Sequence, residues 1–430
     1  MARTRRAAAA AACIALVLAQ PVAARAQVAA EPESWLAHLA FPTNLAFAPD
    51  GRLFFTEKET GRVRIVRDGR LLDRPFVELD VVGEAERGLL GIALDPDFGI
   101  DPWVYLYLSD ARDGRNRLVR IRADGDRAAG APQTLLDLLP SDTGYHNGGD
   151  LLFLSDGTLL VAVGETHDAD RAQDPDDPGG KILRIARDGS VPNDDPVGPG
   201  NPAFTLGHRN SFGLCADVVR GTIWETENGP DVDDEVNRLV AGANYGWPEV
   251  TGVADDPRFT DPEAVFPDTV ALTGCAVAGD ALYVGAFNTG ALYRFALTSD
   301  GQRLGEPTVA ASLPAGITDV TTGPDGALYA ATADAIWRLG GVSADESASP
   351  STAPSPASET PSASLIPESA APSTDAGDAG RSTPAWVPVA AALVLAVGLI
   401  LRLVAGRRLR SADGRDHPDR PDAGGGSPDP

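Results

Sequence analysis

The stretch LAFAPDGRLFFTEKETGRVRIV, residues 45–66, holds the pattern from which the fold can be predicted. An apolar segment leads into Asp50-Gly51, an aromatic-rich segment follows, and a third segment alternates apolar residues with arginines. Asp-Gly between two apolar runs is among the strongest short signals for a β-hairpin. The stretch therefore predicts three antiparallel strands joined by tight turns.

Similar patterns return along the chain, and Asp-Gly recurs at Asp156-Gly157 and Asp325-Gly326. The six units cover residues 45–66, 92–121, 151–185, 212–239, 276–295 and 320–339. Strand-rich repeats of roughly 50 residues indicate an all-β fold, a six-bladed β-propeller. A pair of β-sandwiches is the alternative, but it explains a single repeating period less well. Because the last unit is one strand short, we expect residues 35–41 to complete its sheet and close the ring.

The two ends of the chain have compositions unlike the propeller, which we assign to residues 27–341. Residues 1–26 carry arginines, a short apolar run and Ala24-Arg25-Ala26, which together predict a cleaved export signal rather than a retained anchor. Residues 342–384 are rich in Ser, Pro and Ala and predict a disordered stalk. Residues 385–406 are long and apolar enough for one transmembrane helix, and a detached amphipathic helix would need a polar face that they lack.

Arginines at the start of the tail, residues 407–430, predict that this tail is cytoplasmic and that the propeller lies outside the cell, anchored in the membrane. Removal of the signal would leave Cys215 and Cys275, which begin corresponding segments of successive units. They can form a disulfide if their Cα atoms come within about 7 Å.

Overall charge narrows the class of partner. The chain has 61 Asp and Glu against 36 Lys and Arg. Such an acidic surface repels nucleic acid and favours a small-molecule or protein partner.

A turn in the fourth unit gathers hard oxygen ligands. Gly229-Pro230 is followed by Asp231, Asp233, Asp234 and Glu235. Carbonyl and carboxylate oxygens are the ligands that calcium prefers. The turn therefore predicts a calcium site, with a solvated acidic turn as the alternative.

Six short motifs resemble the glucose/sorbosone dehydrogenase family, the soluble quinoprotein sugar dehydrogenases. In chain order they are Gly88-Leu89-Leu90-Gly91, His146-Asn147-Gly148-Gly149, Gly180-Lys181-Ile182-Leu183-Arg184-Ile185, Gly207-His208-Arg209-Asn210, Glu227-Asn228-Gly229-Pro230 and Asn244-Tyr245-Gly246-Trp247-Pro248. The resemblance covers most of residues 35–340 and implies oxidation of an aldose sugar, with hydride transfer to pyrroloquinoline quinone (PQQ). It says nothing about the electron acceptor that follows.

By this resemblance His146 is the general base, Glu165 is the carboxylate that orients it, and Arg209 acts on the reacting oxygen. From the residues alone, His146 could instead be a structural hydrogen bonder, and Arg209 with Asn210 could anchor a buried loop. The family usually carries Asp where this chain has Glu165.

The resemblance also implies the cofactor ligands. Residues matching quinone-binding positions are Glu86, Arg209, Asn210 and Asn288. Calcium at the quinone would use the carbonyls of Gly229 and Pro230, and a second, structural calcium would use Glu235, Tyr245 and Asp255.

Three departures bear on the cofactor. Asn288 stands where the family has a quinone-binding Lys, and Gly316 and Thr318 stand where it has two Arg. Since PQQ carries several carboxylates, these changes should weaken its binding unless Arg87 compensates. A calcium-stabilised propeller that no longer binds PQQ and acts as a cell-surface binding module is therefore the second hypothesis. A third, a calcium-dependent lactone or ester hydrolase, would require carboxylates that converge from several blades, and the sequence shows no such set.

Overall fold

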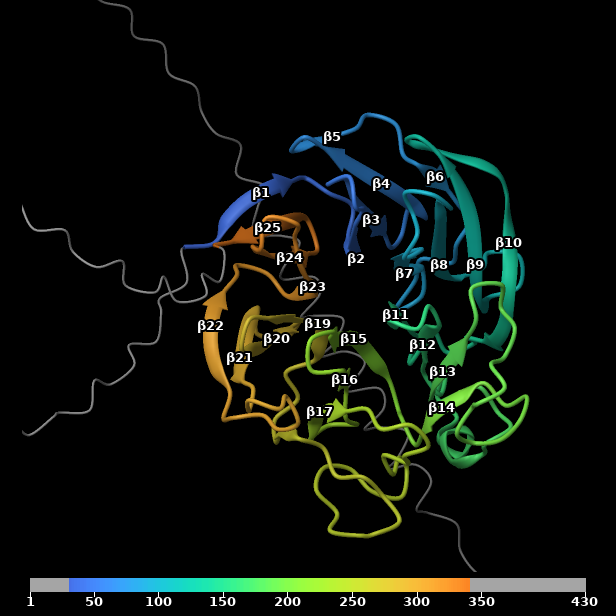
Figure 1. Ribbon diagram of the computed structural model, residues 1–430, viewed down its shortest axis with the longest axis vertical. Helices are drawn as coiled ribbons and strands as arrows, with labels where there is room; N and C mark the ends of the chain where they lie inside the picture. Colours follow the sequence, from blue (N-terminus) through green and yellow to red (C-terminus); the bar gives the residue numbers. More distant parts are fainter. Residues whose placement is uncertain (1–30, 341–430) are drawn as a thin grey trace, which may run out of the picture. The chain divides into compact units, whose positions relative to one another are not determined.

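The computed structural model describes residues 31–340, which form a ring of six antiparallel sheets (Figure 1). The predicted signal, stalk, transmembrane helix and tail (residues 1–26, 342–384, 385–406 and 407–430) lie outside the described residues. Within residues 31–340, the 3-10 helix η1 (Ala169–Gln173) is short, and no helix could cross a bilayer. The predicted six-bladed propeller is confirmed.

Each blade contributes one inner strand to the wall of the central channel. The inner strands are β2 (Pro42–Phe47), β7 (Leu89–Leu94), β11 (Gly148–Phe153), β15 (Ser211–Asp217), β19 (Leu272–Ala278) and β23 (Ile317–Thr322). The second strands are β3 (Leu53–Glu57), β8 (Trp103–Ser109), β12 (Leu159–Val163), β16 (Thr222–Glu227), β20 (Ala281–Ala286) and β24 (Leu328–Thr332). The third are β4 (Arg62–Arg67), β9 (Arg115–Asp124), β13 (Lys181–Ile185), β17 (Asp234–Arg238), β21 (Ala291–Ala296) and β25 (Ala335–Leu339).

In the first five blades, the outermost strands are the part that the repeat pattern did not predict. They are β5 (Arg70–Leu71) with β6 (Val77–Glu78), β10 (Arg127–Pro140), β14 (Ala203–Leu206), β18 (Ala264–Phe266) and β22 (Thr308–Ser312). The last blade is completed by β1 (Glu33–Ala37), which pairs with β25, so closure by the N-terminal segment is confirmed, although the strand starts and ends earlier than predicted.

Each blade packs its apolar side chains against the blades on either side, which buries both faces of its sheet. We number the blades 1 to 6 in the chain order of their inner strands. One apolar cluster, which includes Phe54 and Leu106, joins blades 1 and 2, and another, which includes Tyr105 and Val161, joins blades 2 and 3. These interfaces fix the angle between blades and so hold the loops at each end of the ring in place.

All six inner strands carry a register shift close to their first residues. A β-bulge bends a strand and redirects its side chains. We call the edge of the ring at which the inner strands begin the upper rim. Because pairing is antiparallel, each second strand ends at this same rim, so the bulges and two sets of loops meet there.

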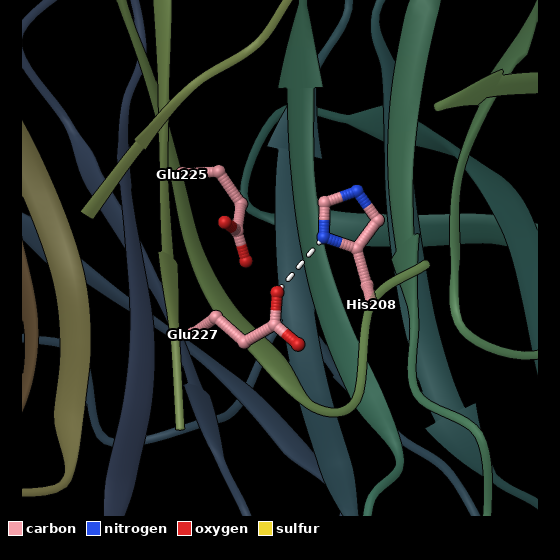
Figure 2. Close-up of side chains that lie close together, drawn as sticks. All are labelled: His208, Glu225 and Glu227. Atoms are coloured by element: carbon pink, nitrogen blue, oxygen red, sulfur yellow. Dashed lines mark hydrogen bonds and ion pairs between the residues drawn. The ribbon is translucent and has the colours of Figure 1, made fainter. Parts of the chain in front are cut away.

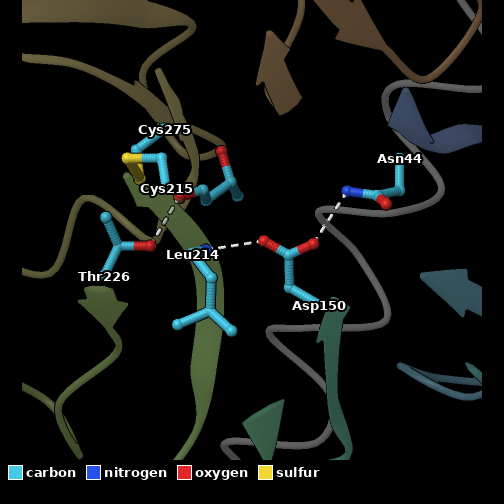
Figure 3. Close-up of a disulfide and its surroundings, with 7 residues drawn as sticks. Asn44, Asp150, Leu214, Cys215, Thr226 and Cys275 are labelled. Atoms are coloured by element: carbon cyan, nitrogen blue, oxygen red, sulfur yellow. Dashed lines mark hydrogen bonds between the residues drawn. A yellow bond between two sulfur atoms is a disulfide. The ribbon is translucent and has the colours of Figure 1, made fainter. Parts of the chain in front are cut away.

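Cys215 on β15 and Cys275 on β19 form a disulfide between blades 4 and 5, with Cα atoms 5.7 Å apart (Figure 3). The pairing considered from the sequence is therefore confirmed. Both cysteines line a central channel of about 320 Å³.

The channel also contains polar side chains from distant blades. Asp150 accepts hydrogen bonds from the amide of Asn44 (3.0 Å) and from the N–H of Leu214 (2.6 Å) (Figure 3). Asp319 of blade 6 faces the same channel and accepts the N–H of Leu45. Burial raises the pKa of Asp150 to about 6, and burial followed by the charge of Asp150 raises the pKa of Asp319. Carboxylates do converge from separate blades, contrary to the sequence-based view, but backbone and amide donors use most of their oxygens.

Candidate functional site

The candidate catalytic residues meet on the upper rim of blades 3 and 4. His146 precedes β11 and Glu165 follows β12, so the antiparallel pairing of these two strands places them side by side. Arg209 and Asn210 precede β15 in the next blade. The N–H of Glu165 donates to the carbonyl of Arg209 at 3.0 Å, which joins the two groups.

His146 and Glu165 form a buried pair. Nδ1 of His146 lies 2.5 Å from Oε1 of Glu165, and Oε2 of Glu165 accepts the N–H of Asp168 at 2.6 Å. A carboxylate at Nδ1 holds the proton on that nitrogen and leaves Nε2 as the proton acceptor. Nε2 makes no hydrogen bond within residues 31–340. Glu165 therefore reaches His146 with its longer side chain, as the resemblance required.

The backbone around this pair adopts an uncommon conformation. His146, Thr166 and His167 have φ of 55°, 54° and 63°. Such positions cost on the order of 1–3 kcal/mol each for residues with a Cβ and are concentrated at functional sites. The N–H of Thr166 bonds to the carbonyl of His146 at 3.0 Å and holds the two loops together. The His167 ring stands edge-on to His146, and the exposed Tyr145 stacks on His167.

Glu86, on the loop before β7, links three blades. Its Oε2 accepts the N–H of His146 at 2.8 Å and the side-chain amide of Asn210 at 3.2 Å. Asn210 in turn accepts the N–H of Gly148 at 3.3 Å. Both residues were predicted to contact a cofactor, and in the structure they position the loop of the candidate base.

Arg209 lies over the Trp247 ring, 5.4 Å from its centroid, and donates to the carbonyl of Asn228 at 2.9 Å. Burial lowers the pKa of its guanidinium. Its backbone N–H donates to the carboxylate of Glu227, which also contacts the ring of His208 (Figure 2). The predicted catalytic Arg209 is thus fixed at both its backbone and its side chain.

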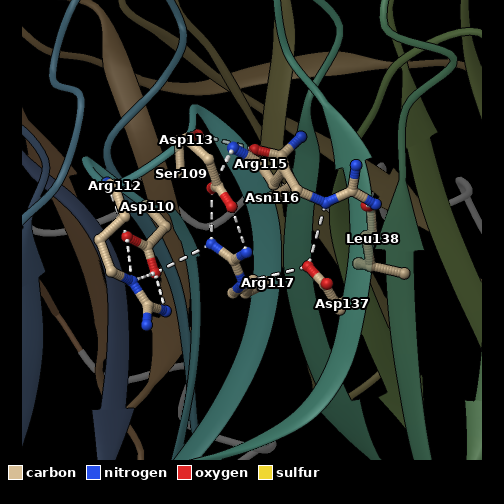
Figure 4. A network of polar contacts seen from close by, with 9 residues as sticks. All are labelled: Ser109, Asp110, Arg112, Asp113, Arg115, Asn116, Arg117, Asp137 and Leu138. Carbon is tan, nitrogen blue, oxygen red and sulfur yellow. Dashed lines mark hydrogen bonds and ion pairs between the residues drawn. The ribbon is translucent and has the colours of Figure 1, made fainter.

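A chain of buried amides supports the His146 loop from below, and it was not anticipated from the sequence. Oγ of Ser109 donates to Asn116 at 2.7 Å, and Asn116 donates to the side chain of Asn147 at 3.0 Å. Asn147 donates to the carbonyl of Gly144, which spans the base of the loop. Arg117, the next residue on β9, forms ion pairs with Asp110 and Asp113 (Figure 4). The one sequence signal for this support was that Asn147 lies within one of the six motifs of the family.

The predicted calcium ligands divide into two groups. Gly229, Glu235 and Tyr245 line one small cavity of about 10 Å³, together with Glu227, Asn228 and Asp233. Pro230 and Asp255 are exposed and do not line it. The hydroxyl of Tyr245 donates to the carbonyl of Arg238 at 2.6 Å, so it is used within the protein.

The donor chemistry of this cavity fits calcium. Burial, and then the charge of Glu227, raise the pKa of Glu235 to about 8. Oδ1 of Asn228 is buried without a hydrogen-bond partner among the described residues. Glu227, Asp233 and Glu235 offer carboxylate oxygens around this space of atomic size, and Asn228 offers an amide oxygen. A hard cation takes such oxygen ligands. The structure brings members of the two predicted sites to one cavity rather than two.

Blades 5 and 6 present different chemistry on the upper rim. Asn288 is exposed and donates to the carbonyl of Thr269, and Thr318 donates to the carbonyl of Pro42 at 2.7 Å. A Cβ on Gly316 would lie 2.2 Å from the carbonyl oxygen of Phe287, so this position cannot hold a side chain in the present backbone. Lys58, which follows β3 of the adjacent blade 1, donates its ammonium to the carbonyls of Gly83, Ala85 and Arg87.

Arg87 was considered as a replacement cation. Its guanidinium donates to the carbonyl of Ser141 at 3.1 Å and contacts Glu84. It lies on the side of blades 2 and 3, and it does not supply charge near Asn288 or Thr318.

Comparison with known proteins gives the family. The sequence profile described as Glucose / Sorbosone dehydrogenase matches residues 39–339. Aldose sugar dehydrogenase YliI of Escherichia coli strain K12 is 28% identical over 333 residues, covering 70% of this chain and 89% of that protein. Quinoprotein glucose dehydrogenase B of Acinetobacter calcoaceticus is 31% identical over 257 residues, or 52% of this chain and 53% of that protein.

A solved structure supports the same assignment. The PQQ-bound form of Aldose Sugar Dehydrogenase from Streptomyces coelicolor is 30% identical, with a TM-score of 0.65 over 71% of this chain and 96% of that one. The profile match spans the ring from the residues after β1 to the end of β25. The chain is therefore a member of the glucose/sorbosone dehydrogenase family.

Proposed function

We propose that this protein oxidises an aldose sugar in a reaction that depends on PQQ and calcium. The observation that supports this most is the buried pair of His146 and Glu165, with Nε2 of His146 available at the upper rim beside Arg209 and Asn210. Quinoprotein and aldose dehydrogenases among the relatives support the same class of reaction.

The chain's own residues account for the proton. Nε2 of His146 takes the proton of the sugar's anomeric hydroxyl, and the carboxylate of Glu165 stabilises the imidazolium that results. Loss of this proton from the hydroxyl oxygen, and of the hydride from the carbon that bears it, converts the cyclic aldose to its lactone. When bound, PQQ supplies the acceptor for the hydride, and calcium polarises the acceptor oxygen. Arg209 would help to hold the quinone, and its guanidinium would stabilise negative charge that develops there.

The fit to PQQ differs between its two ends. Arg209, Asn210 and the calcium cavity suit the reacting carbonyls. The carboxylates at the other end would meet Asn288, Gly316 and Thr318, none of which carries charge. We therefore expect PQQ to bind, with lower affinity than a full set of cations would give.

The test is dye-linked oxidation of a panel of aldoses by the purified chain, supplied with calcium and PQQ. Activity should require both additions, and His146→Ala should remove most of it. Absence of oxidation when quinone is shown to be bound would refute the enzyme proposal.

A non-catalytic, calcium-stabilised binding module is the second candidate, and the absence of positive charge at Asn288, Gly316 and Thr318 favours it. It predicts that PQQ does not bind at micromolar concentration, even with calcium. Equilibrium dialysis of PQQ against the purified chain separates the two candidates.

We further propose that the propeller is exported and held at the outer face of the cell membrane. The composition of residues 1–26 and 385–406 supports this. Protease added to intact cells should release the propeller, whereas protection of the chain until lysis would contradict the proposed location.

A further inference from the structure

Below the rim of blade 4, a histidine and two glutamates meet in the interior. His208 follows β14, and Glu225 and Glu227 point to the same face of β16 because they are two residues apart. One ligand atom from each lies within 4.8 Å of the other two, and all three residues are buried (Figure 2). His208 and Glu225 are 0% exposed.

The ring of His208 is fixed as a metal ligand's ring commonly is. Its Nε2 lies 2.9 Å from the hydroxyl of Thr205, and its Nδ1 faces Oε2 of Glu227 at 2.9 Å. The ring also stacks on Tyr245, with centroids 4.9 Å apart. A histidine that ligates a metal usually engages its other ring nitrogen in a hydrogen bond, which sets the tautomer and the orientation.

Glu225 lacks the partners that a buried carboxylate needs. Its Oε2 accepts one amide N–H of Asn237 at 3.0 Å, but its Oε1 has no hydrogen-bond partner among the described residues. Figure 2 shows its carboxylate directed toward Glu227 and the ring of His208. A buried acceptor left without a partner costs roughly 1–3 kcal/mol, and more when it is charged.

Charge adds to this cost. Glu225, Glu227 and Glu235 lie in one buried region, and within residues 31–340 none of them forms an ion pair with Lys or Arg. Buried charges are tolerated when they are paired or when they coordinate a metal.

We propose that His208, Glu225 and Glu227 bind a divalent transition-metal ion, such as Zn²⁺ or Mn²⁺. An imidazole with two carboxylates suits these ions, whereas calcium prefers oxygen ligands alone. The metal would satisfy Oε1 of Glu225 and tie the loop before β15, which carries Arg209, to β16. This metal site is distinct from the proposed calcium cavity, although Glu227 borders both. This inference does not depend on the proposed reaction.

The test uses the full-length chain, freed of metal with a chelator and then saturated with calcium. Zn²⁺ titrated into this protein should bind with a stoichiometry of one and raise the thermal midpoint. Glu225→Gln keeps the shape of the side chain and removes the charge, and we expect it to weaken Zn²⁺ binding by 100-fold or more. His208→Gln should weaken it similarly.

Two further variants serve as controls. Asp280→Asn alters an exposed carboxylate on blade 5 and should bind Zn²⁺ as the parent does. Glu235→Gln should weaken calcium binding and leave Zn²⁺ binding within a few-fold. The proposal is overturned if the calcium-saturated parent does not bind Zn²⁺ stoichiometrically, or if Glu225→Gln binds it equally well. The latter result would mean that a hydrogen-bonded proton, and no metal, joins these three side chains.

Discussion

Two parts of the upper rim carry different chemistry. We call the part on blades 3 and 4 the polar half, and we compare it with the part on blades 5 and 6. On blades 3 and 4, His146, Glu165 and Arg209 are buried or half-buried, hydrogen bonded and held by unusual backbone conformations. On blades 5 and 6, Asn288 and Thr318 are uncharged and bonded only to backbone carbonyls. The residues for proton transfer and the positions that would hold an anionic cofactor therefore lie on different blades, so one set can be kept while the other loses its charge.

The two parts of the rim also differ in how much they cost the free energy of folding. The polar half keeps strained loops and buried charges, which stability alone would not favour. Its supports reach through Glu86 to blade 2 and through Asn147 to Ser109. This arrangement is expected of a reaction centre and explains why we favour the enzyme over the binding module.

The largest expected effect comes from removing the base on the polar half. His146→Ala should lower kcat by about 10²–10⁴-fold, because general-base catalysis typically contributes that much. Steady-state rates with PQQ and calcium at saturation give the measurement. His167→Ala, which removes the exposed neighbouring imidazole, is the matched control and should retain more activity. A loss of less than about threefold in His146→Ala would mean that another group takes the proton.

Beneath both halves, the channel carboxylates should make stability depend on pH. Asp150 has a folded-state pKa of about 6 against a usual value of 3.8, so the folded protein binds more protons than the unfolded chain between these values. Its contribution to the free energy of unfolding therefore falls by about 3 kcal/mol as pH rises from about 4 through 6.

The pKa of Asp319 is raised as well, so Asp319→Asn should make this fall shallower. Urea unfolding of parent and variant at several pH values, with calcium constant, isolates the difference. A difference between them that is independent of pH would show that these carboxylates do not titrate in the folded protein.

Calcium should stabilise the polar half. Removal by a chelator should lower the thermal midpoint, since calcium at 100 times its Kd contributes about 2.7 kcal/mol by mass action. Glu235→Gln should reduce this dependence, whereas Asp255→Asn, at an exposed position outside the cavity, should not. Equal calcium dependence in the parent and Glu235→Gln would place the ion elsewhere.

The smallest effect should come from adding charge to blades 5 and 6. Asn288→Lys with Thr318→Arg should tighten PQQ binding by about 10–100-fold, because a charge-assisted hydrogen bond contributes about 1.5–3 kcal/mol and ordering the side chains offsets part of it. Gly316→Arg is the contrasting variant, and it should destabilise the protein because its Cβ would meet the carbonyl of Phe287. Unchanged affinity in the double variant would show that PQQ carboxylates do not reach this half.

The sequence predicted the six blades because Asp-Gly hairpins and apolar alternation are local signals. The family resemblance implied the contact of His146 with Glu165, and the structure contains it. The corresponding positions of Cys215 and Cys275 in successive units made a disulfide possible, and the structure shows it. Strand β10 was not predicted because most of it is exposed and lacks an alternating apolar pattern.

Other parts of the site depended on contacts between blades. The bridge from Glu86 to His146, and the meeting of Gly229, Glu235 and Tyr245 at one cavity, are set by bulges and loop directions. The channel carboxylates Asp150 and Asp319 are far apart in sequence and meet only when the ring closes. These features require the three-dimensional register, which no local pattern encodes.

The most direct test of the central claim is a single turnover at the polar half of the rim. The full-length chain is loaded with calcium and a known amount of PQQ, mixed rapidly with an aldose, and followed by the absorbance of the quinone. We predict reduction of one equivalent of bound quinone by the parent, and a rate at least 100-fold lower in His146→Ala at equal quinone occupancy. Equal rates in the two proteins, or bound quinone that no aldose reduces, would contradict the account.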